Sequence, residues 1–136
     1  MATHATRVAM QRNTFRKHEH LCGKVRIREV VTTGSSVHVP PFKLVGKRMA
    51  LPTTAPAQVG FAVPRRHMPS AVDRNRMKRL MREAYRLNKH KLYERLSTTG
   101  AQFAWLFVYQ SRNKVEFAET ELKITQALER WMKHHG

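Results

Sequence analysis

Residues 70–89 (SAVDRNRMKRLMREAYRLNK) constrain the fold more than any other part of the chain. Ser70 and Asp73 have the spacing of a helix capping box, and Pro69 limits extension of a helix backwards. On a helical projection one side is apolar and carries Met77, Leu80, Met81, Ala84 and Leu87. The opposite side carries Asn75, Arg76, Lys78, Arg79, Arg82, Arg86 and Lys89. We therefore expect a helix that packs on a core by one side and exposes six cations on the other.

The basic side of this helix predicts a nucleic-acid contact. Like charges three and four residues apart repel each other, so the arrangement costs stability unless a polyanion neutralises it. Most charge runs are solvated helix faces laced by salt bridges. Here the segment holds only two acids, Asp73 and Glu83, which are too few for that role. We interpret the side as an RNA- or DNA-binding face.

The charge balance of the whole chain supports a polyanionic partner. The net charge is +17 over 136 residues. Residues 1–97 hold 21 Lys and Arg against 5 acids, whereas residues 98–136 hold 5 against 4. The first part therefore predicts a basic surface and the last part a packing element. At 41% hydrophobic residues, a chain of this length forms one domain with one core.

The amino terminus and the single cysteine bear on location. Cys22 has no partner for an intrachain disulfide, which suits a reducing cytosol. No apolar run approaches the length of a membrane span. Residues 1–13 lack the apolar core of a secretory signal, although their basic, acid-free composition leaves a transit peptide open. We predict a flexible basic arm over residues 1–13, a single domain over residues 14–136 and a cytoplasmic protein.

The remaining segments predict an α+β fold of order α-β-β-β-α-β-α. A first helix spans residues 24–33, with Val25 or Ile27 beside Val30 and Val31 as its apolar stripe, and Gly34 ends it. Strands are predicted at residues 36–39, 42–47, 58–63 and 101–109, with a Pro40-Pro41 break and a loop at residues 48–57. Residues 90–96 extend the central helix, and residues 117–134 form the last one.

The strand at residues 101–109 is nearly continuously apolar, which is typical of a central strand covered on both faces. One of its faces carries Phe103, Trp105, Phe107 and Tyr109. Such a row could stack nucleobases, but core packing against helices is the interpretation we favour.

A catalytic site made of protein side chains is not indicated. A metal-dependent nuclease needs several converging carboxylates, and the nine acids form no paired-carboxylate motif. The eight histidines are dispersed, and Cys22 has no second cysteine for zinc.

Residues 71–83 (AVDRNRMKRLMRE) resemble the "RNR" signature of the protein subunit of bacterial ribonuclease P. The spacing of Leu21, Ile27, Val31 and Gly34 extends the resemblance upstream. The resemblance implies a four-stranded mixed sheet backed by helices, ribosomal protein S5 domain 2-like, with a left-handed βαβ crossover.

The resemblance also implies an endoribonuclease that works as a ribonucleoprotein. In it the catalytic RNA removes the 5′ leader of precursor tRNA, and the protein binds the RNA subunit and the leader. Mg²⁺ would be held mainly by the RNA subunit and substrate, the protein alone would be inactive, and no protein partner would be required.

Carried over by position, the RNA-binding residues are Arg65, Arg66, Arg74, Asn75, Arg76, Lys78, Arg79, Arg82, Arg86 and Lys89. Arg74 lies at the margin of the apolar side, so a local structural contact is its alternative role. The implied leader-binding residues are Ile27, Val31, Lys43 and Val45, flanked by Arg28. The family often has aromatic residues at this cleft, and this chain has none at Ile27, Val31 or Val45. For those three residues, core packing and leader contact are equal alternatives.

Two other classes of protein compete with this interpretation. A ribosomal or tRNA-binding protein without associated catalysis would share the charge but not the full motif. A helix-turn-helix DNA-binding protein would need a helix just before the basic one, where this sequence predicts a strand.

Overall fold

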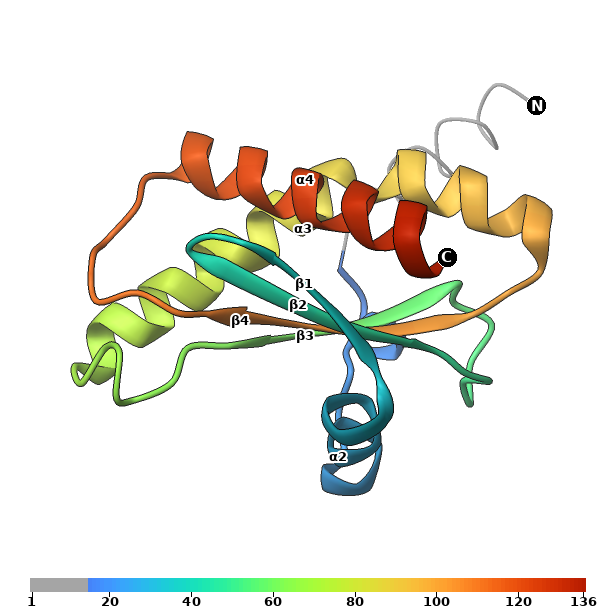
Figure 1. The fold of residues 1–136 in the computed structure, drawn as a ribbon, viewed down its shortest axis with the longest axis horizontal. Helices are drawn as coiled ribbons and strands as arrows, with labels where there is room; N and C mark the ends of the chain where they lie inside the picture. Colours follow the sequence, from blue (N-terminus) through green and yellow to red (C-terminus); the bar gives the residue numbers. More distant parts are fainter. Residues whose placement is uncertain (1–14) are drawn as a thin grey trace.

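The computed structural model describes residues 15–136, and the predicted basic arm at residues 1–13 lies outside them. The elements are η1 (Lys17–Glu19), α2 (Lys24–Thr33), β1 (Ser35–Val39), β2 (Phe42–Arg48), β3 (Ala57–Ala62), α3 (Ala71–Thr99), β4 (Phe103–Tyr109) and α4 (Phe117–His135) (Figure 1). Apart from the short 3₁₀ turn η1, this is the predicted order.

The four strands form one mixed sheet of order β1-β2-β4-β3. β1 and β2 are antiparallel, as are β2 and β4, whereas β3 runs parallel to β4. Because α3 joins β3 to β4, these three elements form the βαβ crossover of the predicted fold. Pro40 and Pro41 form the tight turn of the β1–β2 hairpin, in which Val39 pairs with Phe42.

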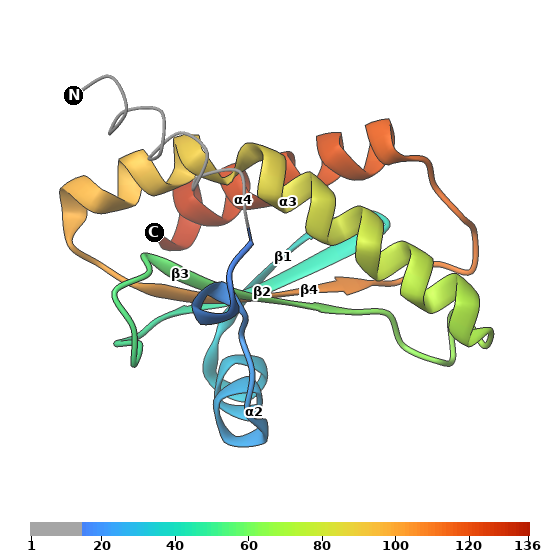
Figure 2. The same cartoon turned by 180° about the vertical axis from the view of Figure 1, so that it is seen from behind.

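Helices cover the two faces of the sheet unequally. α3 and α4 lie across one face, and the short α2 lies against the other (Figures 1 and 2). The side chains of Phe103, Trp105, Phe107 and Tyr109 are all buried among residues of α3, α4 and the neighbouring strands. The prediction that this row packs in the core is therefore confirmed.

α4 docks on the sheet through Trp131. Its indole ring packs edge to face on that of Trp105, with 5.6 Å between the ring centroids. Its Nε1 donates to the Ser35 carbonyl at 2.8 Å. Gly46 makes room for both rings, since a Cβ there would lie 2.2 Å from Cδ1 of Trp105. Only glycine fits at this position of β2.

α3 is a long helix with well-defined ends. Ser70 caps it, with its Oγ accepting the amide N–H of Asp73 at 3.4 Å, and Gly100 ends it in the left-handed conformation at φ 69°. Met77, Met81 and Ala84 are buried as predicted, but Leu87 is 38% exposed. Leu87 therefore does not belong to the buried stripe.

α2 packs on the sheet through Val30, which contacts Leu21, Val45 and Leu106 in a small second core. Ile27 borders this core, whereas Val25 and Val31 are 80% and 51% exposed. Of the two predicted alternatives, Ile27 rather than Val25 completes the stripe, and the inclusion of Val31 was wrong.

Gly34 follows the last residue of α2, as predicted. Its backbone is extended, with a φ of −78°. A Cβ at Gly34 would lie 2.4 Å from the carbonyl oxygen of Val30 and 2.6 Å from that of Gly46. Close approach of two backbones therefore requires glycine here.

Candidate nucleic-acid interface

The first half of α3 presents a basic surface to solvent. Asn75, Arg79 and Arg82 are exposed, and Arg76 and Lys78 are partly exposed. We call these five residues the α3 surface. They lie away from the buried Met77 and Met81, so the helix has the two-sided character that its sequence predicts.

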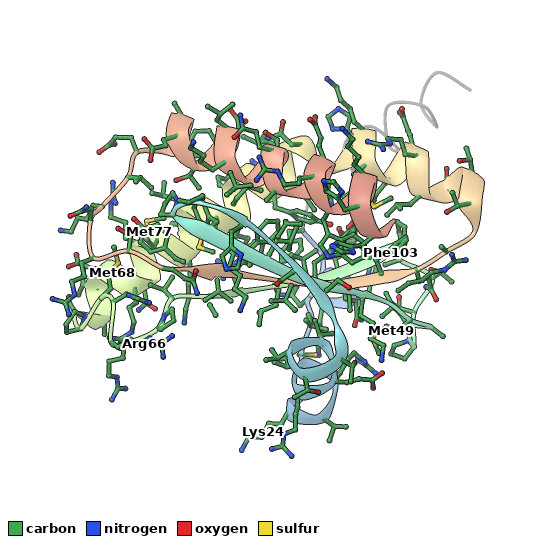
Figure 3. All side chains as sticks on the ribbon, in the orientation of Figure 1. Lys24, Met49, Arg66, Met68, Met77 and Phe103 are labelled. Carbon is green, nitrogen blue, oxygen red and sulfur yellow. The ribbon has the colours of Figure 1, made fainter. Side chains whose placement is uncertain are left out.

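Arg74 fixes the loop that precedes α3. Its Nη1 donates to the carbonyl oxygens of Met68 and Pro69 at 3.0 and 2.6 Å. The structural alternative for Arg74 is therefore realised. The loop that it holds carries Arg65 and Arg66, both exposed, and Figure 3 labels Arg66 at this end of the molecule.

Arg86 is engaged by an acid of its own helix. Its Nη2 and Nε lie 2.5 and 3.1 Å from the Glu83 carboxylate. The hydrogen bond from Arg86 holds the pKa of Glu83 below its ordinary value, and the same contact raises the pKa of Arg86.

The prediction that Lys89 belongs to the exposed basic side is wrong. Its side chain is 1% exposed, and its Nζ lies 2.5 Å from Oε2 of Glu19, which also accepts a hydrogen bond from the Tyr93 hydroxyl at 2.7 Å. Burial lowers the pKa of Lys89, while the hydrogen bond from Lys89 to Glu19 acts in the opposite direction. The Tyr85 hydroxyl donates to that of Tyr93 at 3.1 Å and completes the network.

Residues 15–21 explain this burial. They run along the outer edge of β3, where the Leu21 amide donates to the Val59 carbonyl at 3.0 Å, and they cover the second half of α3. Helical periodicity cannot reveal a covering segment that comes 70 residues earlier in the chain. The one available signal was the spacing of Tyr85, Lys89 and Tyr93, a stripe in which two large aromatic residues flank the lysine.

The predicted leader-binding residues divide into two groups. Val45 is 5% exposed and belongs to the second core, so for this residue the core alternative is the correct one. Ile27 and Lys43 are partly exposed, and Val31 is exposed.

Lys43 belongs to an open row of the sheet on its α2 side. It pairs with His38 of β1 and with Val108 of β4, and Val108 in turn pairs with Ala62 of β3. All but the exposed His38 are partly exposed. The structure therefore places Lys43 beside α2 on an accessible strip of sheet.

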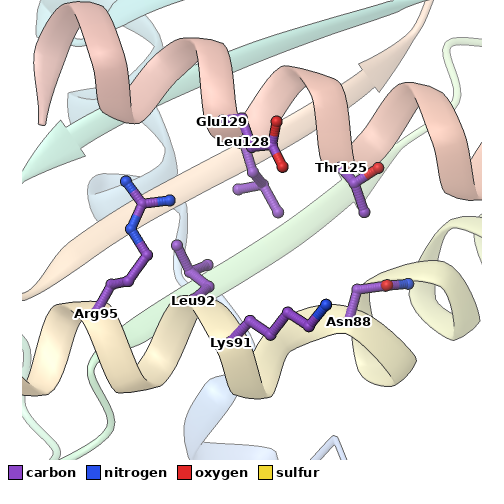
Figure 4. A pocket seen from close by; sticks show the side chains of 7 residues that line it. All are labelled: Asn88, Lys91, Leu92, Arg95, Thr125, Leu128 and Glu129. Atoms are coloured by element: carbon purple, nitrogen blue, oxygen red, sulfur yellow. The ribbon is translucent and has the colours of Figure 1, made fainter.

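A pocket of about 380 Å³ lies away from the α3 surface, between the second half of α3 and α4 (Figure 4). It is lined by Asn88, Lys91, Leu92, Arg95, Thr125, Leu128 and Glu129. Its cations, Lys91 and Arg95, face an acid across the pocket and an apolar floor, so its character is mixed rather than basic.

Most acids of the chain are engaged by cations at scattered places. The ion pairs are Glu19–Lys89, Glu29–Lys47, Asp73–Lys114, Glu83–Arg86 and Glu116–Arg76. Within residues 15–136, no group of three or more His, Cys, Asp or Glu side chains is placed to hold a metal ion. Over the same residues, none of the helices has the length and apolar character needed to cross a membrane.

Sequence relatives point to one family. The Ribonuclease P family model matches residues 15–135. A ribonuclease P protein component from Porphyromonas gingivalis is 32% identical over 112 residues, which cover 82% of each chain. One from Chlorobium phaeobacteroides is 42% identical over 84 residues, which cover 60% of this chain and 58% of that relative.

Solved structures show the same fold. The ribonuclease P protein of Staphylococcus aureus superposes with a TM-score of 0.67 at 16% identity, over 84% of this chain and 95% of that one. That of Thermotoga maritima gives a TM-score of 0.64 at 20% identity, over 82% and 96%. The family match covers nearly all the described residues, and its basic signature forms an exposed helical surface. The chain therefore belongs to the ribonuclease P protein family.

Proposed function

We propose that this protein is the RNA-binding component of ribonuclease P and assists a catalytic RNA in removing the 5′ leader from precursor tRNA. The observation that carries the proposal is the α3 surface, four cations and an asparagine on a rigid helix with few acids beside them. The family match supplies the biological setting.

The α3 surface suits contacts with the RNA backbone. An arginine guanidinium can grip two phosphate oxygens at once, and Lys78 adds a point charge. Arg65 and Arg66 extend the surface because Arg74 holds their loop against the start of α3. Binding would also relieve repulsion among the helix cations.

The leader would lie on the α2 side of the sheet. Ile27, Val31 and Lys43 are accessible there, with Arg28 exposed on α2. No aromatic residue occupies these positions, so shape and backbone contacts would contribute more than base stacking.

The chemistry belongs to the RNA in this proposal. Phosphodiester cleavage needs an activated water and stabilisation of developing negative charge, which Mg²⁺ usually supplies. Five of the nine acids form separate ion pairs, and within residues 15–136 the acids do not gather into a group that fits a Mg²⁺ site. Mg²⁺ would be held mainly by the RNA subunit and substrate. The protein would screen phosphate repulsion and lower the Mg²⁺ requirement, in the cytoplasm and without a protein partner.

The test compares two pairs of cations on the same helix. Lys78→Gln plus Arg82→Gln alters the α3 surface, and Lys91→Gln plus Arg95→Gln removes the same charges at the same spacing from the pocket of Figure 4. Affinity for the RNA subunit is measured at several salt concentrations. The first pair should reduce the log–log salt slope by about one to two units, because about two phosphate contacts are lost.

The control pair should leave that slope unchanged, and neither variant should melt below the parent protein. Equal slopes for the parent protein and the Lys78/Arg82 variant would contradict the proposal. Cleavage of precursor tRNA is then measured with nuclease-free protein alone, with the RNA subunit alone and with both together. Binding to tRNA without any stimulation of the RNA would favour a tRNA-binding protein instead.

A further inference from the structure

We propose that a pocket at the amino-terminal end of α3 binds a backbone phosphate of the RNA subunit, with Arg112 and Lys114 as further contact residues. This inference rests on the proposed function and adds the loop between β4 and α4 to the interface.

The pocket, which we call the end pocket, has a volume of about 300 Å³. It is lined by Arg66, His67, Met68, Pro69, Asp73, Arg112 and Lys114. Three segments meet there, namely the loop after β3, the first turn of α3 and the loop after β4. They meet because β3 and β4 are parallel, so their carboxyl ends lie at the same edge of the sheet.

Hydrogen bonds and ion pairs hold the walls of the end pocket in place. Lys114 Nζ lies 3.1 Å from Oδ1 of Asp73, and Glu116 lies 3.9 Å from Arg76. The hydroxyl of Tyr109, the last residue of β4, donates to the carbonyl of Asn113 in the loop that follows.

The opposite wall is fixed by Arg74, which binds the carbonyl groups of Met68 and Pro69. Met68 is buried and forms part of the floor. Figure 3 shows Met68 and Arg66 together at this end of the molecule. A pocket whose loops are already ordered loses little conformational entropy when it binds a ligand.

The charge of the end pocket favours an anion. Three cations line it against one carboxylate, that of Asp73, which Lys114 already compensates. Arg112 makes no hydrogen bond or ion pair with any described residue, and among the same residues the Arg66 side chain makes one hydrogen bond, from Nε to Nε2 of His67 at 3.5 Å. Both guanidinium groups are therefore available for charge-assisted hydrogen bonds to phosphate oxygens. The positive end of the α3 dipole adds to their effect.

The position of the end pocket identifies the RNA subunit as the source of the phosphate. Arg76 belongs to the α3 surface and is also ion-paired to Glu116 at the end of the loop after β4. This ion pair links the α3 surface to the loop that carries Arg112 and Lys114. An RNA strand bound along the surface would reach the end pocket without leaving the protein.

The experiment uses the full-length protein with the RNA subunit, over a series of salt concentrations. Arg112→Gln should weaken binding about 3- to 10-fold and reduce the salt slope by about one unit, since one phosphate contact is lost. Arg112→Gln plus Lys114→Gln should reduce the slope further. Lys91→Gln plus Arg95→Gln is the matched control and should leave it unchanged.

Asp73→Asn supplies a test of opposite sign. It removes the only acid of the end pocket, so it should strengthen binding to the RNA subunit. In a protein that already carries Arg112→Gln, the gain in affinity from Asp73→Asn should be smaller than in the parent protein. Weaker binding by the Asp73→Asn protein, with an unchanged melting temperature, would contradict a phosphate at this position.

The outcomes separate this inference from the proposed function. A normal slope for the Arg112 variant, with a reduced slope for Lys78→Gln plus Arg82→Gln, would overturn the end pocket alone. Normal slopes for both would overturn the proposed function. An effect seen with precursor tRNA but absent with the RNA subunit would overturn the assignment to that RNA. If Lys114→Gln disturbs folding, the single Arg112 variant, which breaks no described contact, still decides.

Discussion

The basic side chains of α3 differ in what surrounds them. Arg79 and Arg82 are exposed, Arg74 binds two carbonyl groups, and Lys89 is buried against an acid. Substituting each would therefore affect a different property of the protein. We expect substitution of the exposed cations to lower RNA affinity, and substitution of Arg74 or Lys89 to lower stability.

Lys89→Ala should lower the free energy of unfolding by about 3–5 kcal/mol, because it leaves the buried Glu19 carboxylate without its cation. Urea denaturation measures the loss. Lys91→Ala, two residues later and exposed, should change it by less than about 0.5 kcal/mol. A small loss for Lys89→Ala, together with a reduced salt slope for RNA binding, would mean that Lys89 reaches solvent.

Stability should decline above pH 10 partly because of Tyr85. Burial raises the pKa of this phenol, so the folded state keeps a proton that the unfolded state releases near its ordinary pKa of about 10. The contribution of Tyr85 is complete below pH 10 and is lost as the pH rises further. Tyr85→Phe should flatten the decline by about 1.4 kcal/mol per pH unit in that range.

Urea denaturation between pH 9 and 11.5 would check this. The lowered pKa of Lys89 has the opposite sign, since it adds stability as the pH rises toward the ordinary lysine value. Lys89 is present in both proteins. Tyr93, whose pKa is also raised by burial and by its contact with Tyr85, is present in both as well, so the difference between the two curves reports Tyr85 together with its effect on Tyr93. Parallel curves for the two proteins would show that the Tyr85 hydroxyl ionises in the folded state.

At the scale of the elements, local pattern predicts much of what the structure shows. The bounds of α2 and, to within one residue, of the last helix follow from spacing and stop signals, as does the buried side of α3 at Met77 and Met81. The apolar strand β4 begins at Phe103, two residues later than predicted. Periodicity states which residues share a side, but it does not state what covers that side. Lys89 and Val31 were misplaced for this reason. Lys89 is buried by a segment that is distant in the sequence, whereas Val31 lies on a side of α2 that nothing in the described residues covers.

Val31→Tyr on α2 should fold normally because the parent side chain is 51% exposed. If the leader lies beside α2, the new ring can stack on a base. Affinity for precursor tRNA relative to mature tRNA should then rise by up to about 1–3 kcal/mol. Binding of the two tRNAs to the holoenzyme measures this difference.

Val25→Tyr is the control for that experiment, since Val25 is 80% exposed on the same helix but lies outside the predicted leader-binding set. It should leave the ratio of affinities unchanged. An equal gain for both variants would indicate a nonspecific effect of an added aromatic ring.

At the scale of the whole molecule, the strand order and the site depend on contacts between distant segments. Period and turn signals gave four strands, but the parallel β3–β4 pair and its crossover followed only from the family resemblance. Arg112 and Lys114 were not predicted as RNA contacts because they come about 40 residues after Asp73. Only the folded sheet brings the loop after β4 beside the loop after β3 and the start of α3.

The net charge of +17 should make the melting temperature rise with ionic strength. Repulsion among the cations is screened as salt increases, whereas the ion pairs at the surface contribute little. Between 0.05 and 0.5 M salt we expect a rise of roughly 2–5 °C.

Thermal denaturation of Lys78→Gln plus Arg82→Gln tests the cause. This variant should melt higher than the parent protein at low salt and gain less from added salt, because part of the repulsion is already removed. A melting temperature that falls with salt would show that attractive pairs dominate instead.

Glu19 leaves the ribosome 70 residues ahead of Lys89 and 74 ahead of Tyr93. Closing so long a loop is slow. Residues 15–21, although synthesised early, are therefore expected to dock on α3 late in folding. Until residues 15–21 dock, the outer edge of β3 lacks its contact with Leu21, and the ring of Tyr85 lacks its contact with Phe15. An unpaired strand edge invites pairing with another chain. We therefore expect the outer edge of β3 to be open to such pairing during synthesis.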